Sequence, residues 1–348
     1  MVLRLASALV CGIIVLLGVP ATAAPGVVCV MKDPRLDEVS GLVATPTGYV
    51  AMNDGKFGTS VLRLFVLDGS CRVARVITDR SFNPLDPEDL ARSADGTLWV
   101  GDIGDNSRER QRIAVNRIPP GATRGTAYRL TYPDRAHDAE ALLAQPDGRV
   151  VVVTKELAGV ARIYVSSRPL TGPPATVPLS AAGEVEIAPT QTLGGPDVGG
   201  FGSRLVTGGA LSADGRRVVL RTYTDAYEWD VDGGDLAAAL NGPARRRTAL
   251  PGEPQGEAIT FAADGSGYVT ASEGVGQPLR RWTAPAERLS PAQTTAAVKP
   301  SPVVKPPPQR ENGLSPMVIA AVGVLGFVLL MAGFAGLTLR RRRHAPHA

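Results

Sequence analysis

Short runs of apolar residues alternate with polar turns along the chain, and five of these runs share one pattern. In each, an apolar strand leads to a turn that ends in Gly, and a second apolar strand follows. The five repeats begin at Ser40, Glu88, Glu140, Thr207 and Glu257, and the Gly comes eight positions later, at Gly48, Gly96, Gly148, Gly215 and Gly265. A strand–turn–strand unit that recurs roughly every fifty residues is typical of a β-propeller, with one repeat in each blade.

Further apolar runs extend the repeats toward four strands each, as in 89–94, 97–103, 112–118 and 127–132 for the second blade. The last repeat lacks a fourth strand, whereas the run 27–31 precedes the first repeat and has no blade of its own. Placing this run on the outside of the last blade closes the ring and removes its open edges. The pattern therefore predicts an all-β, five-bladed propeller over residues 25–284, closed by the N-terminal strand.

The interval between the third and fourth turn glycines is longer than the others. The extra residues lie around 183–203 and include the Gly-rich stretch 194–202. No helical pattern follows this stretch, and the Walker and dinucleotide spacings are absent, so it does not predict a phosphate site. We expect a long flexible loop on one face of the propeller, and a degenerate sixth blade is the alternative.

The N-terminus predicts export. Arg4 precedes an apolar run over 5–19, and the small residues Ala21, Thr22 and Ala23 follow it. This order is that of a secretory signal peptide, which we place at residues 1–23.

The C-terminal region predicts a membrane anchor. Residues 317–339 carry no charge and are long enough to span a bilayer as a transmembrane helix. The basic tail 340–348 begins with four arginines, which remain on the cytoplasmic side. The Pro-rich segment 285–315 is expected to be an extended stalk between the propeller and the membrane. These features place the protein in the cell membrane as a single-pass protein with its propeller outside.

The net charge of +4 does not indicate a nucleic-acid partner. The four tail arginines and Arg4 account for it, because without these five residues the net charge is −1. No basic face is then left to neutralise phosphates, so a nucleic-acid function is excluded.

The exported chain keeps two cysteines, Cys29 and Cys71, since Cys11 lies in the signal peptide. Paired cysteines are usual in exported domains, and we expect a disulfide between them. Two free thiols buried in strands are the alternative.

Equivalent positions of the repeats form a ring around the centre of a propeller. Three repeats begin with a carboxylate, at Glu88, Glu140 and Glu257. The second strands end on the same face, because antiparallel neighbours alternate in direction, and they bring Lys155 and Arg221 to it. We predict a ligand site at the channel mouth from these five residues.

Crowded carboxylates suit a hard cation such as Ca²⁺, which takes oxygen ligands. The segment Gly101–Asn106 offers three more oxygen side chains, so the predicted metal ligands are the three glutamates with Asp102, Asp105 and Asn106. The alternative is structural: the glutamates pair with Lys155 and Arg221 or cap turn N–H groups, and thereby hold the blades together.

Other chemistries find little support in the sequence. His137 is the single histidine of the predicted propeller, which excludes a multi-His zinc site, and no G-x-S-x-G elbow exists. His137 lies beside Asp138 and is a candidate base, but we expect it to be an exposed residue before a strand. Any catalysis would be metal-assisted hydrolysis that uses carboxylates.

Four phrases carry a resemblance: Asp86–Ala91, Gly101–Asn106, Asp138–Leu142 with Thr154–Glu156, and Gln255–Ile259. They resemble a group of exported propellers found mainly in actinomycetes, which implies no particular activity. More distantly, the repeat is similar to propeller phytases and to gluconolactonase-type lactonases. That similarity implies a divalent metal held in the channel, with Glu88, Glu140 and Glu257 in comparable places. The continuous acidic signature of the phytases is absent, so their activity is not carried over.

Two functions follow as hypotheses. The first is a cell-surface binding or scaffolding module whose partner is an extracellular protein or small ligand. The second is a divalent-metal-dependent hydrolase acting outside the cytoplasm on phosphoesters or lactones. The propeller fold hosts both, so the fold does not decide between them.

Overall fold

The computed structural model describes residues 25–55, 61–283 and 287–289. These residues are almost entirely β-structure, with one short helix among them, α1 (Leu236–Asn241). The predicted signal peptide, most of the stalk, the membrane helix and the basic tail lie outside the described residues. No helix within the described residues has the length and hydrophobicity to cross a membrane.

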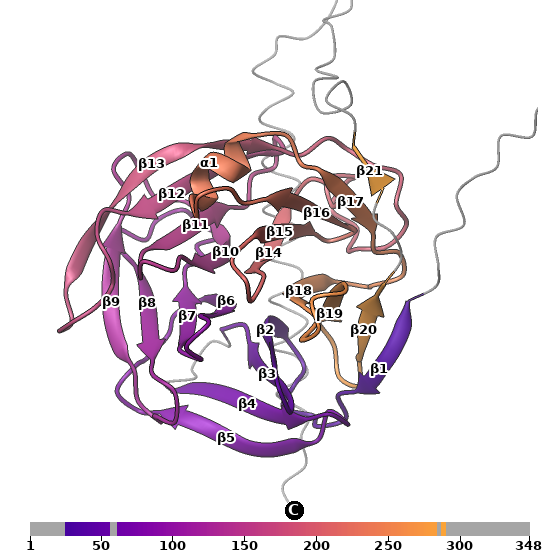
Figure 1. Ribbon diagram of the computed structural model, residues 1–348, viewed down its shortest axis with the longest axis horizontal. Helices are drawn as coiled ribbons and strands as arrows, with labels where there is room; N and C mark the ends of the chain where they lie inside the picture. Colours follow the sequence, from indigo (N-terminus) through magenta and orange to yellow (C-terminus); the bar gives the residue numbers. More distant parts are fainter. Residues whose placement is uncertain (1–24, 56–60, 284–286, 290–348) are drawn as a thin grey trace, which may run out of the picture. The chain divides into compact units, whose positions relative to one another are not determined.

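The strands form antiparallel meanders arranged around a common centre, as in a propeller (Figure 1). The inner strands are β2 (Val39–Thr45), β6 (Pro87–Arg92), β10 (Ala139–Ala144), β14 (Val206–Leu211) and β18 (Gly256–Phe261). The second strands are β3 (Gly48–Asn53), β7 (Leu98–Asp102), β11 (Val150–Thr154), β15 (Arg217–Thr222) and β19 (Tyr268–Ser272). The third strands are β4 (Leu62–Asp68), β8 (Ile113–Ile118), β12 (Val160–Ser166), β16 (Asp225–Asp230) and β20 (Pro278–Trp282). The outer strands are β5 (Val73–Asp79), β9 (Thr126–Thr131), β13 (Thr176–Glu186), β17 (Arg246–Ala249) and β1 (Gly26–Val30), and β21 (Glu287–Arg288) lies beside β17.

The core lies between neighbouring meanders. Inner and second strands such as β10 and β11 are buried along their whole length, which explains their continuous apolar sequence. Side chains of adjacent sheets pack into shared clusters; Val151 of β11, for example, belongs to the same cluster as Leu220 of β15. Each meander therefore has little core of its own and is stabilised by its two neighbours.

The ring closes on itself at the N-terminal strand. The inner strands contact one another in cyclic order, and β18 of the last meander contacts β2 of the first. β1 pairs antiparallel with β20, the outside position expected for it from the sequence. Cys29 of β1 and Cys71 before β5 form a disulfide with a Cα–Cα distance of 5.7 Å, which joins the first and last meanders covalently.

The long connection 187–205 between β13 and β14 contains no strand, so it contributes none to a sixth blade. Thr190 and Thr192 donate hydrogen bonds of 2.6 and 2.9 Å to the carboxylate of Asp225. The N–H of Gly195 donates to the carbonyl of Glu253 at 2.8 Å. The connection is therefore tied down at both β16 and the segment that precedes β18.

Candidate functional site

A β-bulge occurs at the same place in every inner strand. The ladder to the second strand shifts register by one residue at Ser40, Glu88, Glu140, Thr207 and Glu257, the first residues of the five sequence repeats. A bulge leaves one residue unpaired and re-aims its side chain. All five residues are buried, so the bulges bring one polar side chain from each repeat to the hub of the ring.

The carboxylates of the hub lie close to one another. Glu88 and Glu140 share a side-chain hydrogen bond, and each of them also interacts electrostatically with Glu257. Asp54, after β3, and Asp86, before β6, join Glu88 in a group whose ligand oxygens all lie within 4.8 Å of one another. We call Asp54, Asp86, Glu88, Glu140 and Glu257 the hub carboxylates.

Burial and mutual repulsion make the charged form of these groups unfavourable. Burial, followed by the charge of Asp86, raises the pKa of Asp54 to about 8. Burial raises the pKa of Glu140 to about 7, against the opposing effect of Lys155. Burial and Glu140 together raise the pKa of Glu88 and of Glu257 well above the ordinary value. A cation that entered the hub would relieve this repulsion.

Lys155 at the end of β11 is the cation of the hub. Its Nζ donates to Glu140 Oε1 at 2.6 Å and lies 5.2 Å from the centre of the Tyr223 ring. Burial opposes its charge, yet Glu140 and Glu257 raise the pKa of Lys155 above its usual value. Within the described part of the chain, Glu257 Oε1 receives a single 3.5 Å hydrogen bond, from Gln255, and the buried Oε2 has no hydrogen-bond partner. The hub thus contains more carboxylate oxygens than its own donors satisfy.

Gly104 makes room for the crowded oxygens. A Cβ at this position would lie 2.3 Å from Glu88 Oε1 and 2.6 Å from Asp86 Oδ2, so any other residue would push the two carboxylates away. The glycine of the Gly101–Asn106 segment therefore shapes the site from its backbone.

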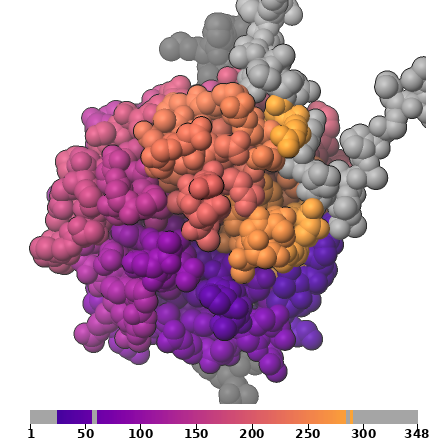
Figure 2. Space-filling model, viewed as in Figure 1, coloured from indigo at the N-terminus to yellow at the C-terminus, as the bar shows by residue number. Residues whose placement is uncertain are grey.

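Asp89 of β6 links its own strand to two other inner strands, β10 and β14. It is fully buried, and its Oδ2 accepts hydrogen bonds from the N–H groups of Leu142 (2.8 Å) and Gly209 (3.2 Å) on two other inner strands. Burial raises the pKa of Asp89 to about 8 despite these bonds. In the space-filling view, atoms of the first, second and last meanders meet at the centre of the face shown (Figure 2). We assign Asp89 a structural role, which the sequence reasoning missed.

The Gly101–Asn106 side chains do not join the hub carboxylates as the sequence predicted. Asp102 Oδ1 accepts from the N–H of Asp86 at 2.8 Å and from Arg110 at 3.0 Å, and Asp105 Oδ2 accepts from the N–H of Arg110 at 2.7 Å. Asn106 is exposed. The three side chains lie outside the group of three carboxylates, because the two aspartates stabilise the loop itself.

Arg221 is held mainly by groups other than the hub carboxylates, although its charge acts to lower the pKa of Glu257. It is completely buried, and its Nη2 forms an ion pair with Glu253 at 2.8 Å. Its remaining donors reach backbone carbonyls, including that of Ala258 at 3.0 Å. Gly256 permits this arrangement, since a Cβ there would lie 1.8 Å from Arg221 Nη2. Arg221 therefore links β15 to β18 and to the segment before it, and its predicted ligand role stays a prediction.

His137 is fully buried, so the expectation of an exposed residue was wrong. Its Nε2 lies 2.7 Å from the hydroxyl of Tyr164 and 3.1 Å from a carboxylate oxygen of Asp134. The ring of Tyr132 packs edge-on against it at 4.9 Å. Tyr132 and Asp134 from its own connection and Tyr164 of β12 thus surround the histidine. The residues next to His137 in the sequence did not indicate this burial.

Glu88, Glu140, Glu257 and Lys155 lie on one face as the sequence predicts, whereas Asp54 and Asp86 were not among the predicted ligands. A signal for them existed, because Asp54 follows a second strand and Asp86 precedes a first strand. Both positions belong to the face where the inner strands begin. Strand direction therefore places both residues on the predicted face, but the sequence does not show which of the acids on that face lie within reach of one ion.

Comparison with known proteins identifies no family. No family model matches the chain, and no curated protein matches it in sequence. Among solved structures, a gluconolactonase from Xanthomonas campestris is 15% identical over 67% of this chain and 68% of that chain, with a TM-score of 0.36. A chain of the mitotic checkpoint complex is 12% identical over 69% of this chain and 60% of that chain, with a TM-score of 0.35. Such low similarity carries no argument about activity, and the propeller-like fold rests on the strand pairing of this chain.

Proposed function

We propose that this protein is an exported, membrane-anchored, five-bladed β-propeller that binds a divalent cation such as Ca²⁺ in its hub and acts as a ligand-binding module at the cell surface. The signal-peptide pattern at residues 1–23 and the uncharged segment 317–339 followed by four arginines support export and anchoring. An extracellular protein or small ligand would then meet the propeller outside the cytoplasm.

The observation that carries the cation site is the group formed by Asp54, Asp86 and Glu88, whose oxygens lie within 4.8 Å of one another. Two further features fit a cation there. Gly104 lets Glu88 and Asp86 lie together without a side chain between them, and Oε2 of Glu257, another hub carboxylate, is buried with no hydrogen-bond partner among the described residues. Carboxylate oxygens are the ligands that Ca²⁺ takes in proteins, and a bound divalent cation would offset the repulsion among the hub carboxylates.

The test is the unfolding temperature of the full-length protein with Ca²⁺ and with EDTA. At a hundredfold excess over Kd, a bound ion stabilises by about 2.7 kcal/mol, which corresponds to a rise of roughly 5–10 °C for a domain of this size. Glu88→Gln should keep the fold, because it removes one of several repelling charges, and should lose most of the Ca²⁺-dependent rise. The matched variant Asp95→Asn, in a turn at the other end of the strands, should keep it. Equal responses in wild type and Glu88→Gln would refute the site.

A metal-dependent hydrolase is the second candidate. Asp54 and Glu140 have pKa values raised to about 8 and about 7, and a group that titrates near neutrality suits general acid–base catalysis. Screening Ca²⁺-loaded protein against lactones and phosphomonoesters tests this function. Turnover that Glu140→Gln abolishes while the Ca²⁺-dependent stabilisation persists would establish it. If the protein binds Ca²⁺ but turns over none of these substrates, the hydrolase function is rejected and the binding function remains.

A further inference from the structure

The outer strands differ in whether their free edges are covered. β9 and β13 belong to neighbouring meanders and pair with each other in parallel, from Thr176↔Arg129 to Pro178↔Thr131. β17 is covered by β21. No described strand pairs with the outward edge of β1 or of β5. An unpaired edge presents N–H and C=O groups that form a template for another strand.

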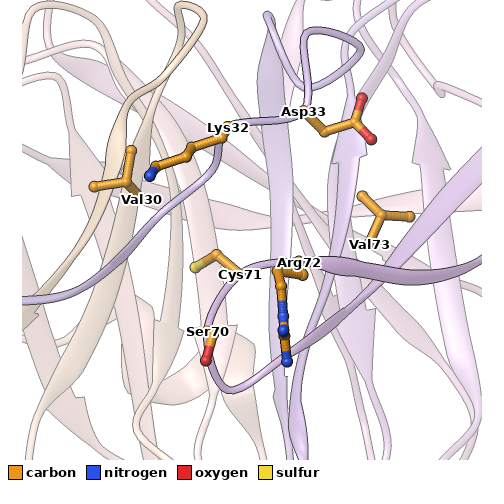
Figure 3. Close-up of a pocket in the computed structure, with 7 residues that line it drawn as sticks. All are labelled: Val30, Lys32, Asp33, Ser70, Cys71, Arg72 and Val73. Atoms are coloured by element: carbon orange, nitrogen blue, oxygen red, sulfur yellow. The ribbon is translucent and has the colours of Figure 1, made fainter.

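The edges of β1 and β5 meet at the seam where the ring closes. Both are outermost strands of neighbouring meanders, as β9 and β13 are, but here the Cys29–Cys71 disulfide takes the place of backbone pairing. A hollow of about 660 Å³ is lined in part by Cys71 of this disulfide, and Figure 3 shows the residues around it. Its lining comes from the end of β1 and the residues that follow it, and from the turn between β4 and β5 and the first residue of β5: Val30, Lys32, Asp33, Ser70, Cys71, Arg72 and Val73.

The side chains that line the hollow combine apolar surface with one cation that has no ion-pair partner among the described residues. Val30 is 36% exposed. Asp33 pairs with Arg35 at 2.6 Å, and Arg72 pairs with Asp68 at 2.8 Å, so these charges are matched within the chain. Lys32 is exposed and has no ion-pair partner among the described residues. The seam therefore carries an excess of positive charge beside its apolar positions.

We propose that the seam is a docking site for an extended, acidic peptide segment. The segment adds as a strand to the free edge of β5, the edge that faces β1. Backbone pairing supplies the affinity in such β-augmentation, and alternate side chains supply the specificity. Apolar side chains of the peptide would face Val30 and Val73, and an acidic side chain would face Lys32. The chain's own segment beyond residue 289 is unsuited to this place: Lys299, Lys305 and Arg310 make it basic, and its prolines lack N–H donors.

The location is tested by hydrogen–deuterium exchange of the full-length protein with a capped Val-Glu-Val-Glu-Val-Glu peptide as the probe. We expect protection confined to residues 26–33 and 70–79. A peptide of the same sequence with alternate backbone nitrogens methylated keeps the side chains but loses the donors, and it should give no protection. Equal protection by both peptides, protection elsewhere or none at all would overturn the proposal.

The charge preference is tested by exchanging charges across the interface. Lys32→Glu should weaken binding of the Glu-containing peptide about threefold to fivefold and favour a peptide with Lys in place of Glu, since one exposed ion pair is involved. Arg129→Glu on the covered β9 edge is the matched control and should change neither affinity. An unchanged preference would overturn the acidic partner. Concentration-dependent self-association that protects the same strands would assign the edge to a second copy and also overturn it.

Discussion

Carboxyl groups lie at both ends of the inner strands, but their pKa values are shifted in opposite directions at the two ends. At the hub end, burial raises the pKa of Asp54 to about 8 and of Glu140 to about 7. At the turn end, hydrogen bonds from the backbone N–H of Ser266 and from Arg281 lower the pKa of Asp264 to about 2. The backbone bond from Thr97 likewise lowers the pKa of Asp95. The repeat therefore uses its turn aspartates to stabilise the fold, whereas its hub carboxylates oppose one another.

Exposed apolar side chains follow the same division. Five of the large apolar residues that are exposed lie in connections at the hub end, before an inner strand or after a second strand: Leu85, Leu157, Leu193, Phe201 and Val275. The others are Val27 and Val30 of β1, so none lies in a described turn at the opposite end. The connections at the hub end therefore differ from the turn end both in their carboxyl groups and in their exposed apolar side chains.

The largest expected effect is the difference in stability lost when a buried ion pair at the hub end is broken and when an exposed ion pair at the turn end is broken. Glu253→Ala leaves Arg221 without its partner in a fully buried position, and we expect a loss of about 3–5 kcal/mol in the free energy of unfolding, measured by chemical denaturation. Arg281→Ala removes the exposed pair with Asp264 and should change the transition little. Similar losses in the two variants would contradict the division between the ends.

A smaller effect is expected from pH in the absence of divalent cations. A carboxyl whose folded pKa is raised stabilises the protein below its unfolded pKa, near 4, and this stability is lost as the pH rises through the folded value. With Asp54 at about 8, the free energy of unfolding should fall by about 2 kcal/mol between pH 5 and pH 8, after allowance for its partial exposure. Denaturation in EDTA at the two pH values measures this fall.

Asp54→Asn should flatten that alkaline decline. The turn aspartates act in the other direction: their lowered pKa values contribute stability above pH 4 that is lost as the pH falls toward 2. Asp264→Asn should therefore leave the decline between pH 5 and pH 8 unchanged. If the wild-type protein in EDTA is equally stable at pH 5 and pH 8, the pKa values of the hub carboxylates are not raised in the folded state.

The repeat made most of the fold predictable. Equal spacing from Glu88 to Gly96 and from Glu257 to Gly265 identifies one supersecondary unit, and the unpaired run at 27–31 indicated where the last sheet is completed. The face of Glu88, Glu140 and Lys155 followed from strand direction alone. The five-blade count, the membrane anchor and the resemblance to actinomycete proteins stay predictions.

Side-chain partners were the part that the sequence could not supply. Arg221 lies within β15 and Lys155 directly follows β11, and both were predicted on the hub face. Arg221 pairs with Glu253 from the connection before β18, whereas Lys155 pairs with Glu140 of its own meander. His137 became buried because Tyr164, 27 residues away, closes over it. Such contacts depend on which loops pack together, and loop packing is not periodic, so the repeat gives no information about it.

The smallest expected effect concerns the two glycines that flank β7, Gly96 before it and Gly104 after it, and their different influence on the Ca²⁺ response. Gly104→Ala places a Cβ against Glu88 and Asp86, whose ends can move aside, and should cost about 1 kcal/mol while removing at least half of the Ca²⁺-dependent stabilisation. Gly96→Ala at the turn end, where φ is +87°, should cost a similar amount through backbone strain and leave the Ca²⁺ response intact. Unfolding temperatures with Ca²⁺ and with EDTA compare the pair. Because the two variants lose similar stability, a Ca²⁺ response that falls equally in both would mean that the glycine at the hub serves the fold and not the site.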